Sequence, residues 1–357
     1  MVTVRNHTKK NVGIVFGGES AEHEVSVLSA LSVLEAMNKD EFEPHLIGVD
    51  ESGSWHLVDE GGMSDEKISR RKAIEKNSRG RLHISSDNSG LSFTHHDLSI
   101  PKFDILFLVM HGPKGEDGSL QGLLELMGIP YVGPGVLSSA IGMDKDISKR
   151  LLREAGIPVA DYAVLRKHDD HMQMAESVAA SFSYPLFVKP ANLGSSIGIS
   201  KVRNNTELLQ AITDSFRHDR KVVIEKTIVG DEIECAVLGN ADPKVSVPGR
   251  VIFTNDFYDY EAKYGDNKGT RLEIPAQLSD TLQTKIQDTA RRAYQALECE
   301  GLARVDMFVT IDGDVYVNEV NTLPGFTKYS MYPKLWEASG LPYSELITKL
   351  INHALDR

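Results

Sequence analysis

The stretch RVDMFVTIDGDVYVNEVN, residues 304–321, contains two β-rich runs that are separated by Asp312 and Gly313. An Asp-Gly pair between two such runs is the sequence pattern of a two-residue hairpin turn. Counting outward from that turn places Asp306 directly opposite Glu319. A four-residue loop gives the same register, whereas a three-residue loop breaks it. The stretch therefore predicts a β-hairpin in which two carboxylates face each other.

The same register places Arg304 opposite Asn321, and all four side chains share one face because strand side chains alternate with period two. Directly opposed carboxylates have Cβ atoms about 5 Å apart and repel each other. We therefore expect a positive group between Asp306, Glu319 and Asn321. An all-oxygen set suits Mg²⁺ or Ca²⁺ better than zinc, and Mg²⁺ usually completes its shell with water and substrate phosphates. A solvent-exposed hairpin with scattered charges is the alternative explanation.

A second stretch, FVKPANLGSSIGIS at residues 187–200, leads from Lys189 at a strand end into a loop of glycines and serines. Glycine lets backbone N–H groups converge on an anion, and serine hydroxyls add further donors. The loop is not a Walker loop, and no G-x-G-x-x-G fingerprint occurs in the chain. The stretch predicts an anion site of another kind, with an ordinary flexible hairpin loop as the alternative.

A third stretch, YDYEAKYGDNKG at residues 258–269, is aromatic and charged. It predicts a mobile lid at residues 256–270 that brings Lys263 and Tyr264 over a site and excludes water. A polar surface loop is the more common explanation of such a composition.

The whole chain of 357 residues is too long for one compact core. Its net charge of −12 argues against a general nucleic-acid binder, which needs surplus Lys and Arg. No run approaches the roughly 20 apolar residues of a membrane span. The two cysteines lack the spacing of a zinc or redox motif. We expect a cytoplasmic protein with reduced, buried thiols and no nucleic-acid or membrane partner.

The pattern of apolar runs divides the chain into an N-terminal α/β domain with parallel strands at 1–133 and two further lobes at 134–224 and 225–357. Short strands among glycine loops, followed by hairpins and helices, make these two lobes α+β. Residues 51–100 are polar, charged and rich in Gly and Ser, and they predict a surface excursion from the first domain.

The first domain opens with VGIVFGGESAEHEVS, residues 12–26, in which a buried strand ends in two glycines and leads into a helix. Apolar residues recur along that helix at Val25, Leu28, Leu31 and Leu34. A phosphate site at this turn needs backbone N–H groups and positive charge, but the turn is followed by Glu19, Glu22 and Glu24. The residues alone therefore leave the purpose of the acidic turn open.

Seven segments together resemble the ATP-grasp superfamily and, within it, the D-alanine–D-alanine ligases. They run in order over nearly the whole chain: GGESAEHEVS (17–26), HGPKGEDGSLQG (111–122), FVKPANLGSSIGIS (187–200), VIEKTIVGDEIE (223–234), YDYEAKY (258–264), ARVDMF (303–308) and NEVNTLPGFT (318–327). The resemblance implies a three-domain ATP-grasp architecture, in which the parallel-sheet α/β domain is followed by two α+β lobes that enclose ATP. Seven matches at compatible spacing are specific, although each alone is weak.

The resemblance explains the acidic turn, because it implies that Glu22 binds the ammonium group of the first D-alanine. Ser26, His111 and Ser195 are implied to be its companions around that amino acid. Independently of the resemblance, a carboxylate at Glu22 is expected to stabilise a helix N-terminus by a few tenths to about 1 kcal/mol. Both roles are compatible.

The resemblance also implies a nucleotide site, a metal site and an oxyanion site. It implies that ATP is bound by Lys145, Lys189, Ser196, Glu225, Lys226, Ile228, Glu232 and Lys263, with 225–228 as the hinge that pairs with adenine. It implies that Asp306, Glu319 and Asn321 hold two Mg²⁺ ions, for which Mn²⁺ is expected to substitute. Arg304 and the backbone N–H of Gly325 are implied to stabilise an oxyanion, and Ser330 to bind the second carboxylate. The implied catalytic set is Glu22, Ser195, Arg304, Tyr264 and Gly325.

The implied reaction joins two D-alanine molecules for peptidoglycan precursor synthesis. A carboxylate is a poor electrophile, so the first D-alanine takes the γ-phosphoryl group of ATP and becomes D-alanyl phosphate. The amine of the second D-alanine then attacks, and ADP and phosphate are released. The family also implies a homodimer. Tyr264 favours D-alanine as the second substrate, because relatives that make the D-lactate ester differ in this loop.

Several alternatives remain at this point. The second substrate is D-serine or D-lactate in some relatives, and other ATP-grasp enzymes are carboxylases or different carboxylate–amine ligases. Those last relatives should lack GGESAEHEVS and YDYEAKY. A nucleotide-sensing scaffold should have lost Arg304 or a metal ligand, yet each of those positions is filled. A Rossmann-type dehydrogenase is excluded by the missing glycine fingerprint.

Overall fold

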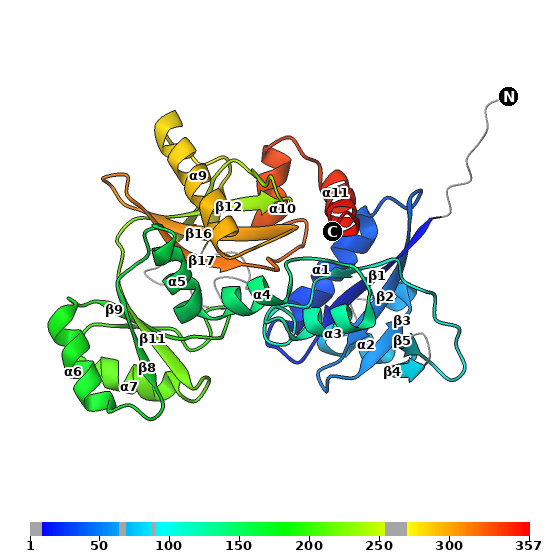
Figure 1. Ribbon diagram of the computed structural model, residues 1–357, viewed down its shortest axis with the longest axis horizontal. Helices are drawn as coiled ribbons and strands as arrows, with labels where there is room; N and C mark the ends of the chain where they lie inside the picture. The colour runs from blue at the N-terminus through cyan, green and yellow to red at the C-terminus, as the bar shows by residue number, and fades with distance from the viewer. Residues whose placement is uncertain (1–8, 64–68, 88–89, 254–269) are drawn as a thin grey trace.

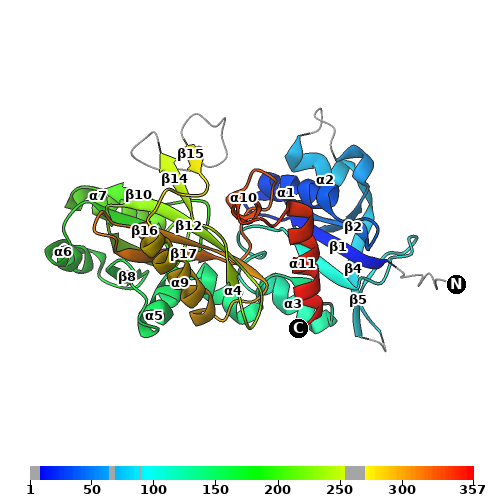
Figure 2. The ribbon, with the colours of Figure 1, turned by 90° about the horizontal axis from the view of Figure 1, so that it is seen from above.

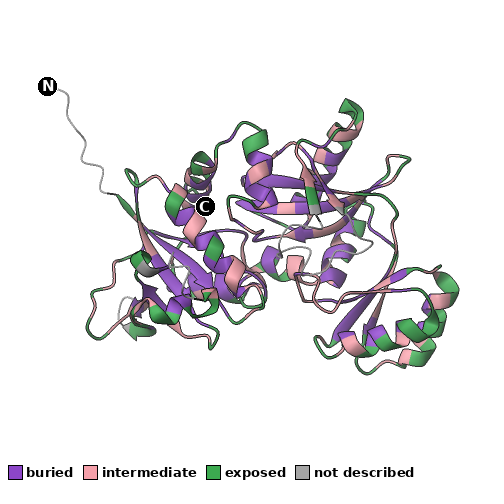
Figure 3. Ribbon diagram, turned by 180° about the vertical axis from the view of Figure 1, so that it is seen from behind, coloured by how far each residue is buried: buried purple, intermediate pink, exposed green. Residues whose placement is uncertain are grey.

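The computed structural model describes residues 9–63, 69–87, 90–253 and 270–357. Within those residues the chain forms three sheets that follow one another along the sequence (Figure 1). The first sheet lies at one end of the molecule and the second at the other, with the third between them and above (Figure 1). The interior strands of all three are buried, as Figure 3 shows.

The first sheet has seven strands in the order β5-β4-β3-β2-β1-β6-β7. The strands β1, β2, β6 and β7 pair in parallel, and β3, β4 and β5 continue the sheet in antiparallel pairing. The bounds are β1 Lys10–Gly17, β2 Phe42–Val49, β3 Trp55–Val58, β4 Ser78–Asp87, β5 Gly90–Thr94, β6 Ile105–Leu108 and β7 Tyr131–Val132. The helices beside it are α1 His23–Ala36 and α3 Ser119–Met127. The predicted parallel α/β architecture of this region is confirmed.

The helix predicted after the first strand is confirmed as α1. Of its apolar residues, Leu34 is buried, whereas Leu28 is 39% exposed. The inward face also carries Ser26 and Ser29, which are completely buried. Their hydroxyls form the hydrogen bonds described below, so their burial costs little.

The segment 51–100 forms more than a surface excursion. It supplies β3, β4 and β5, and the short helical segments η1 Glu60–Gly62, η2 Arg70–Lys72 and α2 Ala73–Lys76. Ile74 of α2 is completely buried, and its side chain fills the space beside two glycines of the parallel strands. A Cβ added at Gly17 would lie 2.6 Å from its Cδ1, and one added at Gly48 would lie 2.8 Å from its Cγ2. Although residues 51–100 are mostly polar, a few of their apolar side chains, such as Ile74, pack into the core of the first domain.

The second sheet has four antiparallel strands in the order β10-β9-β11-β8. Their bounds are β8 Tyr162–Arg166, β9 Leu186–Pro190, β10 Ser200–Val202 and β11 Lys221–Lys226. Two helices, α6 His171–Ser181 and α7 Asn205–Ser215, pack side by side against this sheet (Figure 1). Each begins at a side-chain cap, from Asp170 and Asn204 respectively, which satisfies N–H groups of its first turn.

The third sheet has the order β15-β14-β12-β16-β17, with β13 paired to β12. Its bounds are β12 Asp231–Leu238, β13 Lys244–Val245, β14 Gly249–Phe253, β15 Thr270–Glu273, β16 Leu302–Val309 and β17 Val315–Asn321. Odd-numbered residues of β12 and β16 are buried in a core with α9 Asp280–Ala296. Because strand side chains alternate, the even-numbered residues face the opposite side, where the candidate site lies.

The remaining helices join the lobes. The helices α4 Val136–Met143 and α5 Lys145–Glu154 follow the first sheet, α10 Met331–Ala338 packs on β12, and α11 Tyr343–Leu355 closes the chain. The helix α11 packs on β6, β7 and α1, so the C-terminal segment completes the first core (Figure 2). The predicted domain boundaries at 133 and 224 stay predictions, and β7 ends at Val132 while β11 ends at Lys226. Within the described part of the chain, no helix has the length and apolarity that crossing a lipid bilayer requires.

We expect Ile74→Ala to lower the free energy of unfolding by about 2–4 kcal/mol, because it empties a buried space between the sheet and α2. The matched control is Ile84→Ala on β4, whose side chain is 39% exposed. That change should cost well below 1 kcal/mol beyond strand propensity. Urea unfolding measures both. Equal losses would contradict the anchoring role of 51–100.

Candidate active site

The hairpin of β16 and β17 brings Asp306 and Glu319 opposite each other, as the sequence predicted. The loop and the register near it differ from the prediction. The predicted two-residue turn is wrong, because Val309 pairs with Val315 and residues 310–314 form the loop. That loop shifts the register by one, and a β-bulge between Val317 and Glu319 shifts it back. Two departures from the ideal hairpin cancel at the site.

The pairing continues across a third strand that sequence counting did not reach. Glu234 of β12 pairs with Asp306 of β16, which pairs with Glu319 of β17, so three carboxylates lie in a row. The positive group that this row requires is Arg304. Its Nε and Nη2 donate to the two oxygens of Asp306 at 2.7 Å, and its Nε lies 2.8 Å from Glu234 Oε2. Asn321 also donates from Nδ2 to Asp306 at 2.9 Å.

Arg304 is strongly held as a cation. Burial alone lowers the pKa of its guanidinium, but the charges of Asp306 and Glu234 and the hydrogen bonds to Asp306 more than offset this and raise it. The chemistry of the donor set fits a hard divalent cation, since Asp306, Glu319 and Asn321 offer only carboxylate and amide oxygens. Among the residues with described positions, no group of three His, Cys, Asp or Glu side chains is arranged to hold a metal by itself. Mg²⁺ usually completes such a shell with water and substrate phosphate oxygens.

Two lysines from the second sheet and its neighbourhood lie near this face. Lys145 begins α5, and its Nζ donates to the carbonyl of Leu193 at 2.5 Å. Lys189 at the end of β9 donates from Nζ to Glu225 Oε2 at 2.7 Å. Both lysines are buried and flank the glycine-rich loop. The arrangement places two positive charges beside the glycine-rich loop, as an anion site requires.

Glu225 takes a structural position that its predicted hinge role did not indicate. Its carboxylate lies between Lys189 and Lys149, with Lys149 Nζ 3.0 Å from Oε1. Burial alone raises the pKa of Glu225, but the charges and hydrogen bonds of the two lysines hold it at about 2. Sequence reasoning missed Lys149, although its place four residues after Lys145 on one helix puts both on the same face.

The glycine-rich loop of the second lobe reaches the acidic turn of the first. Ser195 Oγ donates to an oxygen of Glu22, so the two predicted residues meet. Ser195 and Ser196 adopt positive φ values of 53° and 59°. Such backbone angles are rare for residues other than glycine and persist only where the surrounding structure fixes the loop. Gly112 closes the other side, since a Cβ there would lie 3.1 Å from Glu22 Oε2.

Ser26 is buried beneath this turn and joins two strand ends. Its Oγ accepts from the N–H of Gly17 at 2.7 Å and donates to the carbonyl of Val109 at 2.5 Å. Both hydrogen-bonding directions of the hydroxyl are therefore used inside the protein. In the structure Ser26 joins these strand ends beside the turn of Glu22, and its implied place near the first D-alanine stays a prediction.

His111 connects the first lobe to the loop that contains Gly325. Its Nδ1 lies 3.0 Å from the carbonyl of Leu323, and its Nε2 lies 3.2 Å from Ser29 Oγ. Ser29 Oγ also accepts from the N–H of Phe326 at 3.2 Å. Sequence reasoning missed Ser29, although its spacing from Glu22 and Ser26 places all three on one face of α1.

A second carboxylate beside His111 affects its charge. Burial lowers the pKa of His111, but the hydrogen bond and charge of Glu116, with the charge of Glu22, raise it above its ordinary value. Burial in turn raises the pKa of Glu116. The first-lobe site therefore holds a buried histidine whose pKa is raised by neighbouring carboxyl groups.

The other predicted residues are less closely gathered. Ser330 Oγ accepts from the N–H of Thr327 at 3.1 Å and lies 3.2 Å from where a Cβ on Gly325 would stand, so Gly325 and Ser330 are neighbours. Lys226 is exposed, and Ile228 and Glu232 are half-buried. Lys263, Tyr264 and the predicted lid up to residue 269 lie outside the described residues.

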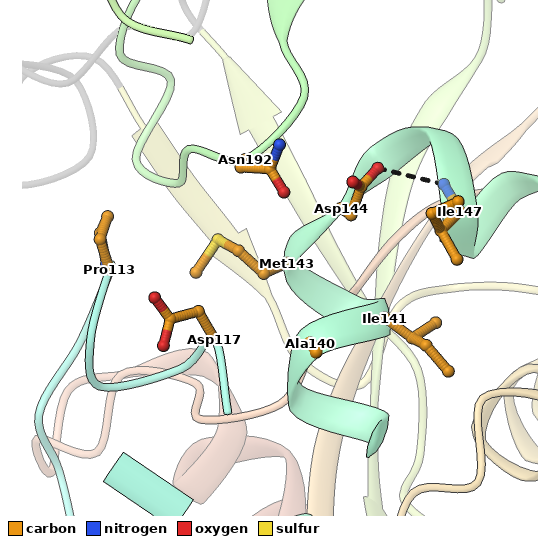
Figure 4. A pocket seen from close by; sticks show the side chains of 8 residues that line it. All are labelled: Pro113, Asp117, Ala140, Ile141, Met143, Asp144, Ile147 and Asn192. Atoms are coloured by element: carbon orange, nitrogen blue, oxygen red, sulfur yellow. Dashed lines mark hydrogen bonds between the residues drawn. The ribbon is translucent and has the colours of Figure 1, made fainter. Parts of the chain in front are cut away.

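A cavity of about 360 Å³ opens beside this site, between the loop after β6, the α4–α5 junction and the glycine-rich loop (Figure 4). Figure 4 shows Asp117 and Met143 directed toward the same space as Asn192. None of the predicted site residues lines it, although Asp144 immediately precedes Lys145. Its position shows that the three segments meet without filling the space between them.

Family models match both parts of the chain. The model described as D-ala D-ala ligase N-terminus matches residues 11–134, and the model described as D-ala D-ala ligase C-terminus matches residues 151–352. The chain belongs to the D-alanine–D-alanine ligase family. Over 351 residues, 98% of its length, it is 48% identical to the D-alanine–D-alanine ligase of Oceanobacillus iheyensis and 46% identical to D-alanine–D-alanine ligase A of Salmonella typhimurium. It covers 96% of each of these ligases.

Solved structures of the D-alanine–D-alanine ligase family have the same fold. The D-alanine-D-alanine ligase from Coxiella burnetii superposes with a TM-score of 0.87 at 38% identity, covering 98% of this chain and 94% of that one. The VanG D-Ala:D-Ser ligase from Enterococcus faecalis superposes with a TM-score of 0.85 at 37% identity, covering 97% of this chain and all of that one. The ATP-grasp architecture implied by the sequence motifs is confirmed, and the chain is an enzyme of the ligase class.

We expect the stabilisation from the Glu225 carboxylate to depend on pH. Its pKa in the folded protein, about 2, lies below its ordinary value of 4.5. The contribution, on the order of 3 kcal/mol, is therefore complete above about pH 4.5 and is lost as the pH falls toward 2. Comparing urea unfolding of the unmodified protein and Glu225→Gln should show a difference that shrinks over this interval. The exposed control Glu75→Gln should show a small, flat difference, and a flat profile for Glu225→Gln would refute the assignment.

Proposed function

We propose that this chain joins two D-alanine molecules in an ATP-dependent reaction through a D-alanyl phosphate intermediate. The observation that carries the proposal is the contact between Ser195 and Glu22. It places a carboxylate suited to an amino acid's ammonium group directly beside the glycine-rich loop and its two lysines. An amino acid bound at Glu22 therefore has its own carboxylate near the place where ATP phosphates would lie.

The residues around that point suit the first half of the reaction. Lys145 and Lys189 supply positive charge that offsets the repulsion between the phosphates and the carboxylate of D-alanine. Ser196 extends the loop of donors, and the hinge of Glu225, Lys226 and Ile228 with Glu232 would take the adenosine. The proposed Mg²⁺ ligands are Asp306, Glu319 and Asn321, and Mn²⁺ should substitute. Bound there, these ions supply charge neutralisation at the phosphates.

The second half of the reaction needs an oxyanion to be stabilised. Arg304 is fixed by Asp306 and Glu234 on the face of the third sheet, so its charge is preorganised. With the backbone N–H of Gly325 it would oppose the tetrahedral oxyanion, each donor contributing about 3–4 kcal/mol by analogy with other oxyanion holes. Ser330, the neighbour of Gly325, would hold the carboxylate of the second amino acid. His111 would keep Glu22 and the Gly325 loop together, and Ser26 would hold the turn.

D-alanine is the proposed second substrate. The curated relatives at 44–48% identity carry the name D-alanine–D-alanine ligase, and the D-Ala:D-Ser ligase is a more distant match at 37%. Lys263 and Tyr264 are proposed to close over the intermediate and exclude water. The family resemblance further suggests a cytoplasmic homodimer that takes part in peptidoglycan precursor synthesis, without nucleic-acid or membrane partners.

The direct test is phosphate release from ATP and Mg²⁺ by the purified protein with single amino acids. D-Alanine should support release and L-alanine should not, because Glu22 and Ser195 fix the ammonium group in one orientation. Mass spectrometry of the product identifies the dipeptide, and competition with D-serine and D-lactate separates the alternatives. Equal activity with both enantiomers of alanine would remove the assignment.

We expect Glu319→Ala and Asp306→Ala to abolish metal-dependent turnover while the fold survives. The loss should exceed the roughly 10–100-fold that removal of an outer-shell partner costs at metal sites. The matched control is Asp312→Ala, which removes an exposed carboxylate from the same hairpin and should leave turnover near its original value. Turnover and circular dichroism are measured together. Persistence of turnover in either site variant would show that the hairpin does not hold the ions.

A further inference from the structure

Four groups form a closed ring of ion pairs and hydrogen bonds at the junction of the second and third sheets. Lys149 Nζ lies 3.0 Å from Glu225 Oε1 and donates to the backbone carbonyl of Asn318 at 3.2 Å. Lys189 Nζ donates to Glu225 Oε2 at 2.7 Å and to Asn318 Oδ1 at 3.3 Å. Each lysine therefore touches both Glu225 and Asn318.

The ring joins elements that are distant in sequence. Lys189 and Glu225 belong to strands of the second sheet, Lys149 to α5, and Asn318 to β17 of the third sheet. Asn318 is the residue that the β-bulge leaves out of the pairing between Val317 and Glu319. A bulge redirects the backbone and side chain of its extra residue. Here both the carbonyl and the amide of that residue meet the lysines, and the next residue is the proposed metal ligand Glu319.

Charge decides what the ring can do. The side chains of Lys149, Lys189 and Glu225 are 1%, 9% and 4% exposed, so solvent compensates them little. A single carboxylate compensates a single ammonium group. If Glu225 paired with Lys189 alone, the two charges would cancel. Because Lys149 also pairs with Glu225, two ammonium groups share one carboxylate and the ring retains one positive charge. The charges of Glu319 and Glu232 also act on Lys189. Within the ring itself, the surplus favours an anion next to Lys189, the more exposed of the two lysines.

We propose that Lys149 is a positioning residue for ATP, which shares Glu225 with Lys189 and thereby leaves Lys189 its charge for the nucleotide phosphates. Through the carbonyl of Asn318 it also fixes the bulge that aims Glu319. The inference rests on the proposed function, because it takes Lys189 as a phosphate ligand. Lys149 itself touches neither substrate.

Burial and neighbouring charges shift the pKa values of the two lysines in opposite directions. Burial lowers the pKa of Lys149, and the charge of Lys189 lowers it further, against the opposing charge of Glu225. For Lys189, burial also lowers the pKa, but the charge and hydrogen bond of Glu225 outweigh it and raise the pKa above its ordinary value. Lys189 therefore stays protonated.

The test is Lys149→Met, which keeps the length of the side chain and removes its charge. We expect ADP with Mg²⁺, titrated by calorimetry, to bind about 10–100-fold more weakly, the effect of losing a charged hydrogen-bond partner. The KM for ATP should rise by a similar factor, whereas the KM for D-alanine should change less than about twofold. Lys149→Arg should recover most of the nucleotide affinity, which a merely structural loss of packing would not predict.

The matched control is Lys221→Met. Lys221 is a buried lysine, as Lys149 is, and it pairs with the carboxylates of Asp144 and Asp146. It lies outside the ring. It should lose thermal stability without the selective loss of ADP affinity. If Lys149→Met does not fold, Lys149→Gln decides, because its amide keeps a polar donor in this position but carries no charge; a several-fold loss of ADP affinity is expected. Unchanged ADP affinity in a folded variant overturns the inference alone. Absence of dipeptide synthesis by the unmodified protein, with ADP binding intact, would overturn the proposed function instead.

Discussion

Compensation of buried charge is the constraint on which this site depends. The third sheet places three carboxylates side by side on adjacent strands, at Glu234, Asp306 and Glu319. Like charges this close repel, and burial removes the water that would screen them. Arg304 compensates two of them directly, through short contacts to Asp306 and Glu234. The opposite arrangement, two lysines around Glu225, lies in the neighbouring lobe.

These two clusters explain why the lobes are held in their observed arrangement. The contacts of Asn318 tie the third sheet to both lysines, so the acidic row and the basic pair lie close to each other. Arg304 compensates the acidic row within the third sheet, whereas the basic pair draws its partners from the second sheet, α5 and β17. Removing one partner of such a buried pair leaves an uncompensated charge, which is more costly than the pair is stabilising. The lysines of one cluster could therefore also attract an anionic substrate, and the carboxylates of the other could attract its counterions.

The first lobe contributes mainly by the geometry of its strand ends. Its parallel strands all end at one edge, where the carboxyl ends of β1 and β6 carry Gly17 and the loop with His111. Open α/β sheets commonly bind ligands at that edge. Ser26 and Ser29, both buried on α1, hold the edge through backbone groups of Gly17, Val109 and Phe326. Glu22 therefore stands on a rigid support when it meets Ser195.

The sequence by itself determined the parallel first sheet, the family and the acidic turn at Glu22, because these depend on local periodicity and on residue types at short spacing. It also predicted that Asp306 faces Glu319, but that pairing holds because a longer loop and a β-bulge offset each other. Tertiary structure decided the rest. It placed Glu234 beside Asp306 and Lys149 beside Glu225, and it buried Ile74 of the polar segment in the first core. Such pairings join residues from different strands and helices, and local patterns carry no information about which distant element will compensate a buried charge or fill a space above a glycine.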